Sequence, residues 1–407
     1  MSKTICFLVA EHPFLDARIF QKEAKSLVRK GYNVTMIIPR REGFLFDIDG
    51  SLLTDCFLET SFMHEGVRII AYDPPRAKRQ IARQLYYAKS GKLDPLPSPL
   101  TTLGVELQAD LYHAHEFSSC YDALMIKRVL NQRKQRTRII YDSHELVPDA
   151  LEKMSRITRV KMTELLEQMF KELDTVITVS KSIQQRYEQM NAIVPVEVLF
   201  NSPLLSPFEQ KNKDDHSPLV LGYVGRMDED KGSLARLIQI VEYANRFINL
   251  RVKVIGGLAE PARNRVPEHI RKKIDWVGWV PYEKLAEELR DIDIGWIDIK
   301  TENSLNRMYS MPNKFFSYLE RGIPPLVNRG KDMKAFISEY QCGFVLEENA
   351  SPVDFAKALI RLNEDRAQIT ERGLRARKVM EERYGWEKME QHLYEIYERL
   401  LSEPAKR

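Results

Sequence analysis

The sequence predicts an α/β protein of two domains, each built around a parallel β-sheet. Short apolar runs alternate with amphipathic segments along most of the 407 residues, and this alternation is typical of βαβ units with right-handed crossovers. The chain is also too long for one ordinary hydrophobic core. We therefore expect an N-terminal domain over residues 1–201, a linker rich in proline and charge over 202–218, a C-terminal domain over 219–383, and a last helix over 384–407 that packs back toward the N-terminal domain.

The composition indicates a globular protein of the cytoplasm. Hydrophobic residues make up 43% and charged residues 29% of the chain, and no apolar run approaches the ~20 residues that span a bilayer. The apolar start, Ile5 to Ala10, is too short for a secretory signal. The four cysteines lie far apart, without metal-ligand spacing, so we expect a reducing compartment and no metal site.

The N-terminal segment reads as a βαβ unit. We predict a strand over Lys3–Ala10, a helix over Asp16–Lys30 that stops at Gly31, and a strand over Asn33–Ile38. The first turn has no G-x-G-x-x-G pattern, which a dinucleotide-binding dehydrogenase would need there. Considered by itself, Asp16 is expected to be a helix N-cap, and Arg18 is expected to be a charged residue on the surface.

Polar residues follow successive predicted strands of the N-terminal domain. The strand DLYHAH ends in His113 and His115, which alternation places on one face. Ser143, His144 and Glu145 follow the next strand. Ligands bind at this edge of an open parallel sheet, so a functional and a purely structural role for these histidines are about equally supported.

Two stretches carry basic residues and no acid, one from Arg76 to Lys92 and one from Lys127 to Arg138. Either stretch is a solvated helix face or a surface for anionic lipid or a phosphorylated acceptor. We do not expect a nucleic-acid partner, because no binding motif accompanies the charge.

The second domain begins with a strand, a glycine turn, a basic pair and a helix. Leu219–Val224 is the strand, Gly225 lies at the turn, and Arg226 and Lys231 follow it. A helix N-terminus beside two cations suits a diphosphate. The alternative is a solvated loop whose charges serve solubility. Further strands are predicted over 251–255, 274–280, 292–297 and 325–328, and helices begin near Pro312 and Trp386.

These segments together resemble the retaining glycosyltransferases of family four. GYVGRMDEDKG is similar to the diphosphate loop of that family, and DLYHAHE, IIYDSHEL, DTVITVSKSI and VLFNSP are similar to its N-terminal segments. DWVGWV and PNKFFSYLERGIPPLV resemble its nucleobase and ribose segments. The matches occur in order over nearly the whole chain.

The resemblance implies the GT-B fold, in which two Rossmann-like domains face each other across a deep cleft. It implies a retaining, metal-independent hexosyltransferase with a UDP- or GDP-linked sugar donor, no cofactor, and a saccharide or lipid-linked acceptor, in the synthesis of surface polysaccharide or glycolipid. Peripheral contact with an anionic membrane at the inner face of the cell membrane fits such an acceptor. His115 matches the catalytic histidine. The other implied contacts are Arg226, Lys231 and Gly225 for the diphosphate, Trp279, Val280 and Ser317 for the base and ribose, Asn313 and Lys314 near the sugar and phosphate, and Asp16, Arg18, His144 and Glu145 on the acceptor side.

One departure from the family weakens the resemblance at the donor. The family carries two glutamates eight apart, and Tyr309 and Ser317 occupy those positions here. A serine hydroxyl makes a shorter, neutral contact with a ribose, and Glu320 replaces it only if the helix is rotated or shifted. The replacement favours a catalytically weak partner subunit as an alternative to an active transferase, and a nucleotide-sugar epimerase that shares the fold is a further alternative.

Overall fold

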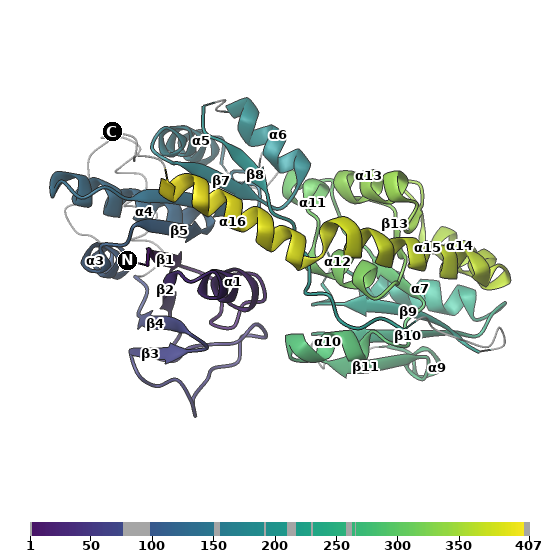
Figure 1. Ribbon diagram of the computed structural model, residues 1–407. Helices are drawn as coiled ribbons and strands as arrows, with labels where there is room; N and C mark the ends of the chain where they lie inside the picture. Colours follow the sequence, from purple (N-terminus) through teal and green to yellow (C-terminus); the bar gives the residue numbers. More distant parts are fainter. Residues whose placement is uncertain are drawn as a thin grey trace. The chain divides into compact units, whose positions relative to one another are not determined.

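The computed structural model describes residues 2–75, 98–149, 155–190, 193–209, 217–228, 231–257, 263–264 and 266–402. The chain forms two compact units, Met1–Phe200 with Met389–Arg407 and Asn201–Lys388. Each unit contains one β-sheet with α-helices packed against it (Figure 1). The prediction of an α/β protein with two parallel-sheet domains is therefore confirmed.

The N-terminal sheet has eight strands in the order β3-β4-β2-β1-β5-β6-β7-β8. Only β3 runs antiparallel to its neighbour, and sequence reasoning did not find this edge strand. The central strand β1 pairs with β2 on one side and β5 on the other, so the strand order reverses between β1 and β5. The bounds are β1 Thr4–Val9, β2 Asn33–Pro39, β3 Ser61–His64, β4 Val67–Tyr72, β5 Leu111–His115, β6 Arg138–Ser143, β7 Thr175–Thr178 and β8 Val196–Val198.

The helix after β1 begins later than the sequence predicts. The Asp16 carboxylate accepts hydrogen bonds from the amides of Arg18 and Ile19 at 2.8 and 2.9 Å, so it caps a π-helical turn, η1, that continues into α1. The helical segments of this unit are η1 Ile19–Ala24, α1 Lys25–Arg29, α3 Pro99–Leu107, α4 Glu116–Gln132, α5 Arg156–Phe170 and α6 Lys181–Met190.

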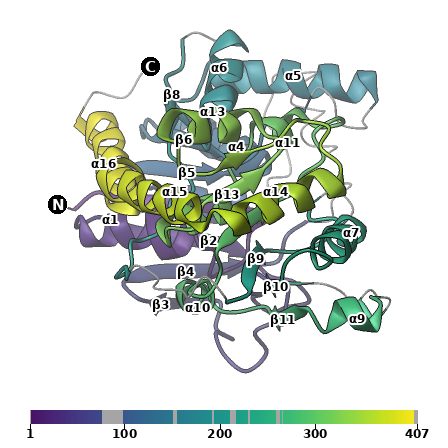
Figure 2. The ribbon, with the colours of Figure 1, turned by 90° about the vertical axis from the view of Figure 1, so that its right-hand side faces the viewer.

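The last helix, α16 Trp386–Ser402, lies beside α1 in both views (Figures 1 and 2). The Tyr394 hydroxyl donates to the Ser26 carbonyl at 2.9 Å, and Lys30 pairs with Glu398 at 2.7 Å. An apolar stripe of the helix, including Leu393 and Ile396, is fully buried. These contacts attach α16 to the N-terminal unit.

The C-terminal sheet has six parallel strands in the order β11-β10-β9-β12-β13-β14. Its strand order reverses between β9 and β12, and ligands of open α/β sheets bind beyond the strand ends at such a point. The bounds are β9 Leu219–Val224, β10 Leu250–Ile255, β11 Ile274–Gly278, β12 Ile294–Ile297, β13 Pro325–Val327 and β14 Phe344–Val345. The helical segments are α7 Leu234–Ala244, α9 Glu268–Arg271, α10 Tyr282–Glu288, α11 Leu305–Tyr309, α12 Asn313–Glu320, α13 Lys331–Tyr340, α14 Pro352–Glu364, α15 Arg366–Val379 and η2 Met380–Tyr384.

The start of the predicted linker is fixed to the C-terminal unit by a buried ion pair. Glu320 accepts from the amide and hydroxyl of Ser206 at 3.0 and 2.6 Å, and from Arg377 at 2.8 Å. Glu320 and Arg377 are both buried.

Within the described ranges, no helix has the length and apolar character needed to cross a bilayer.

Candidate functional site

A buried ion pair forms the centre of the candidate site in the N-terminal unit. Arg18 Nε and Nη2 lie 2.9 and 3.1 Å from the two oxygens of Asp142, and Arg18 Nε lies 2.9 Å from Glu23 Oε1. Arg18 is only 3% exposed, so the expectation of a surface charge is wrong. Burial alone would raise the pKa of Asp142, but Arg18 and His144 hold it well below its usual range. Asp142 is therefore a buried carboxylate anion.

Two stacked histidines lie against this carboxylate. The rings of His113 and His115 are 4.4 Å apart, so the prediction that they share a face is confirmed. His115 Nδ1 lies 3.5 Å from Asp142 Oδ2 and 3.3 Å from His144 Nε2. Burial lowers the pKa of His115 to about 4 and that of His113 well below its usual value. Both imidazoles are neutral at neutral pH and can donate or accept one hydrogen bond at each nitrogen.

The hydroxyl of Tyr397, from α16, lies 2.7 Å from His113 Nδ1, and both side chains are fully buried. Tyr397→Phe should lower the free energy of unfolding by about 1–3 kcal/mol, because it leaves a buried ring nitrogen unpaired. Tyr394→Phe is the matched control, since its hydroxyl bonds a backbone carbonyl at the half-buried edge of the same helix. Denaturant titration followed by hydrogen exchange of α16 compares the two, and equal losses would contradict the special role of Tyr397.

The cluster has an outer part of three residues, of which the sequence analysis named His144 and missed His12 and Glu116. His12 follows β1, Glu116 is the first residue of α4, and His144 follows β6. Their side chains are 24%, 13% and 12% exposed. His12 was detectable as a polar residue just past a predicted strand. The structure thus brings together four predicted residues, Asp16, Arg18, His115 and His144, whereas Glu145 is exposed and its carboxylate forms no contact with the cluster within the described residues.

The basic stretch Lys127–Arg138 is not an unpaired cationic surface. Lys127 and Arg138 are buried and pair with Asp174 at 3.1 and 2.6 Å, and Arg128 pairs with Glu172. The acids lie about 40 positions away, between α5 and β7, so local composition hid them. The other predicted basic stretch, 76–92, lies outside the described residues.

The candidate donor site of the C-terminal unit is a glycine turn after β9. The Tyr223 hydroxyl lies 2.9 Å from the Arg226 carbonyl and 3.1 Å from the Lys231 carbonyl, which closes the turn. Gly232 has a φ of +70°, and a Cβ there would lie 2.3 Å from the Tyr223 ring. Glycine is therefore required at this position for the loop to fold over the tyrosine.

Three cationic side chains surround this turn. Arg226 and Lys231 are exposed. Lys314, in the first turn of α12, lies with Nζ 3.9 Å from the Tyr223 ring centre, and a Cβ on Gly225 would lie 3.5 Å from it. Burial and the neighbouring Lys231 lower the pKa of Lys314 to about 7. None of the three forms an ion pair with a described residue, so their charge is available to an anion.

The predicted base residues Trp279 and Val280 directly follow β11, and the predicted ribose residue Ser317 lies on α12. The Trp279 indole is 44% exposed and packs so close to Gly257 that a Cβ there would lie 2.6 Å from Nε1. Val280 is half-buried, and Asn313 is exposed at the start of α12. Ser317 is 7% exposed and donates to the Asn313 carbonyl at 3.1 Å. Because Glu320 is engaged with Ser206 and Arg377, it does not replace the missing glutamate.

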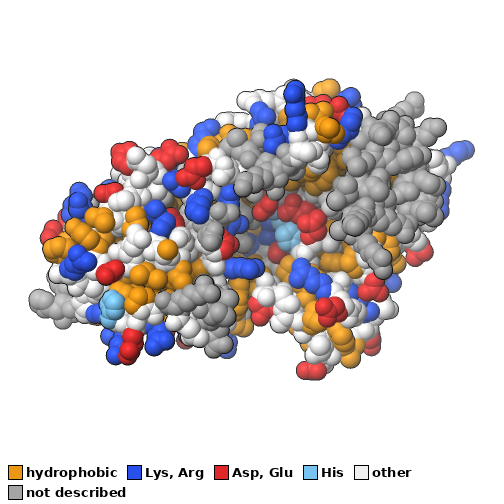
Figure 3. Space-filling model, turned by 180° about the vertical axis from the view of Figure 1, so that it is seen from behind, with side chains coloured by type: hydrophobic (Ala, Val, Ile, Leu, Met, Phe, Trp, Pro, Cys, Tyr) orange, Lys and Arg blue, Asp and Glu red, His pale blue; other side chains and the backbone are white. Residues whose placement is uncertain are grey.

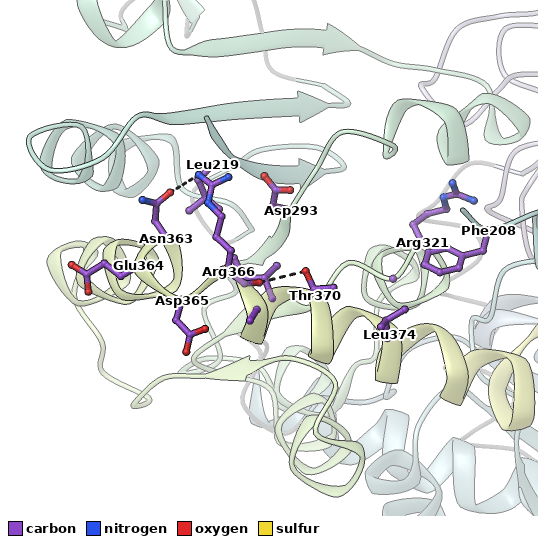
Figure 4. Close-up of a pocket in the computed structure, with 13 residues that line it drawn as sticks. Phe208, Leu219, Asp293, Arg321, Asn363, Glu364, Asp365, Arg366, Thr370 and Leu374 are labelled. Atoms are coloured by element: carbon purple, nitrogen blue, oxygen red, sulfur yellow. Dashed lines mark hydrogen bonds between the residues drawn. The ribbon is translucent and has the colours of Figure 1, made fainter. Parts of the chain in front are cut away.

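A cavity of about 520 Å³ lies at the opposite end of this sheet (Figure 4). It is lined by Leu219, the first residue of β9, and by Asp293, Arg321, Arg366 and Thr370. Arg366, on the wall of the cavity, donates to the carbonyl of Ser217 at 2.6 Å. No residue predicted for the donor site is among its described lining residues, so it is not part of that site.

Comparison with known proteins matches both halves of the chain to glycosyltransferase families. Residues 17–202 match the model of Glycosyltransferase Family 4 and residues 207–379 that of Glycosyl transferases group 1. Sucrose-phosphate synthase of Thermosynechococcus elongatus is similar in structure, with a TM-score of 0.67 at 16% identity over 99% of this chain and 100% of that chain. Anabaena HepE in complex with UDP is similar in structure, with a TM-score of 0.65 at 14% identity over 97% of this chain and 100% of the HepE chain. A search of curated protein sequences found no match.

Proposed function

Because the chain is a group 1 glycosyltransferase with the GT-B fold, we propose that it moves a sugar from a nucleoside diphosphate sugar to a saccharide or lipid-linked acceptor, with retention of configuration. The observation that carries the proposal is that Lys314 lies against Tyr223 and Gly225 in the same glycine turn that bears Arg226 and Lys231, at the switch point of the C-terminal sheet. Such points bind ligands in open α/β folds.

The chemistry that these cations supply is stabilisation of the leaving diphosphate. Charge builds on the diphosphate as the glycosidic bond breaks, and fixed cations that face it stabilise that charge without reorganising. Arginine and lysine side chains make charge-assisted hydrogen bonds to phosphate oxygens. In this proposal the donor diphosphate is held by side chains rather than by a metal ion.

Lys314 should take up a proton when the diphosphate binds. Its lowered pKa leaves it mostly neutral at pH 8 in the free protein, and a bound anion favours the charged form. We expect an uptake approaching one proton per UDP at pH 8, and an affinity that falls as the pH rises above 7. Calorimetry in two buffers of different ionisation enthalpy measures the uptake. The same uptake in Lys314→Met would contradict this assignment.

The donor nucleotide is proposed to be UDP, with GDP as the alternative. HepE, whose structures align with 97–98% of this chain, has been crystallised with UDP and with UDP-glucose. His115 is proposed to hydrogen-bond the transferred sugar through a neutral ring nitrogen, since its Nε2 has no partner among the described residues. We further propose an acceptor from surface polysaccharide or glycolipid synthesis in the cytoplasm, with peripheral contact at the membrane.

Incubation with labelled UDP- and GDP-sugars tests the proposed function. An active transferase transfers or hydrolyses the donor with the anomeric configuration kept in the product. A second candidate, a weak partner subunit, is favoured by Tyr309 and Ser317 in place of the family's glutamates, and it predicts nucleotide binding without turnover. Formation of an epimeric nucleotide sugar would instead identify an epimerase. Either of these last two outcomes would overturn the proposal of an active transferase.

A further inference from the structure

Three side chains at the carboxyl edge of the N-terminal sheet present a set of metal ligands. Glu116 Oε1 lies 3.4 Å from His12 Nε2 and 3.6 Å from His144 Nδ1, and the three atoms lie within 4.8 Å of one another. They follow β1, β5 and β6, which are neighbours in the sheet. Ligand atoms bound to one tetrahedral ion at 2.0–2.2 Å are about 3.4 Å apart, so the separations of Glu116 Oε1 from the two histidine nitrogens match such a site.

The second nitrogen of each histidine faces a carboxylate. His12 Nδ1 lies 3.5 Å from Asp16 Oδ2, and His144 Nε2 lies 3.2 Å from Asp142 Oδ2. Metal-binding histidines almost always bond a carboxylate, carbonyl or water through the other ring nitrogen, which fixes the tautomer and orients the ring. Here both rings are oriented so that the nitrogen near Glu116 is the one left for an ion.

The charge of the cluster calls for additional positive charge. Three carboxylates contact the two outer histidines: Asp16, Glu116 and Asp142. A divalent cation held between these histidines would also be attracted by these carboxylates. Acidic side chains are also seen gathered around a histidine on the surface in Figure 3.

The backbone at Glu116 supports a specific role for this carboxylate. Its φ is +73°, a left-handed value that costs a residue with a side chain about 1–3 kcal/mol. Such strain persists where the surroundings require a particular side-chain position. In this structure it aims Glu116 between the two histidines.

We propose that His12, Glu116 and His144 bind one divalent transition-metal ion, and that Zn²⁺ is the best match. Two imidazoles and one carboxylate with an open fourth position are typical ligands of zinc, and imidazole favours zinc over magnesium or calcium. The ligands come from positions 12, 116 and 144, so no local spacing could have indicated the site. The site lies in the N-terminal unit, whereas the proposed diphosphate residues lie in the C-terminal unit, and the two proposals can fail separately.

The competing occupant is a proton on His12. Burial opposes protonation, but hydrogen bonds to Asp16 and Glu116 raise the pKa of His12 to about 10. A proton on His12 would supply positive charge without any ion, so the experiment must detect the metal itself.

The test uses the full chain freed of metal with a chelator and titrated with ZnSO₄ in a calorimeter, without nucleotide sugar. We expect one Zn²⁺ per chain. Binding should weaken at least tenfold in His144→Ala and about 10- to 100-fold in Asp16→Asn, which removes only the partner of His12. His392→Ala is the control and should leave the affinity unchanged, because His392 lies on α16 and pairs with Glu197.

A spectrum of the unmutated protein keeps the test independent of folding in the variants. Co²⁺ at this site should give the visible absorption of a four- or five-coordinate ion. No zinc binding, binding that His144→Ala leaves unchanged, or a six-coordinate cobalt spectrum like that of the free ion would overturn the proposal.

Discussion

Arg18→Ala is expected to lower the free energy of unfolding of the N-terminal unit by about 3–5 kcal/mol, the range measured when one partner of a buried ion pair is removed. Arg18 is 3% exposed, and Asp142 and Glu23 are fully buried beside it. The variant leaves two carboxylates out of water without their cation. Asp142 must then take up a proton or draw water into the core.

The matched control is Arg29→Ala. Arg29 lies at the end of α1, the helix that follows β1 and Arg18 in the chain. Arg29 pairs with Glu390 but is half exposed, and such surface pairs contribute about 0–1 kcal/mol. Hydrogen exchange of β5 and β6 amides, read by mass spectrometry, reports the N-terminal unit separately from the other one. A loss in Arg18→Ala no greater than in Arg29→Ala would show that the buried pair adds no stability.

Lys231→Ala should weaken UDP binding by roughly 10- to 150-fold, because one charge-assisted contact with a phosphate contributes roughly 1.5–3 kcal/mol. Lys231 is exposed and closes the turn with Asp228, whose carboxylate accepts the Lys231 amide at 2.7 Å. Alanine keeps the backbone amide that forms this bond, so the loss of UDP affinity measures the contribution of the lysine side chain.

Lys273→Ala is the control for this effect. Lys273 precedes β11, at the amino end of the same sheet, and its ammonium donates to the side chain of Asn249 at 3.4 Å. Calorimetric affinities for UDP compare the two variants. An affinity within twofold of the unmutated protein in Lys231→Ala would remove the turn after β9 from the donor site.

The sequence alone determined the features that depend on local periodicity. Alternation in DLYHAH placed His113 and His115 on one face, because successive residues of a strand point to opposite sides of a sheet, and their rings are stacked in the structure. The apolar run 219–224 and the glycines after it marked β9 and its turn, because strand length and backbone freedom are properties of adjacent residues.

Only the tertiary structure decided which charges are buried and which partners they have. Arg18 and Asp142 are 124 positions apart, and Tyr397 reaches His113 across 284 positions. The acid-free composition around Arg138 concealed its pairing with Asp174 on a neighbouring connection. Strand order brings such residues together, and it is set by the packing of the whole sheet rather than by any local pattern. For the same reason, the ligand set of His12, Glu116 and His144 exists only once β1, β5 and β6 lie side by side.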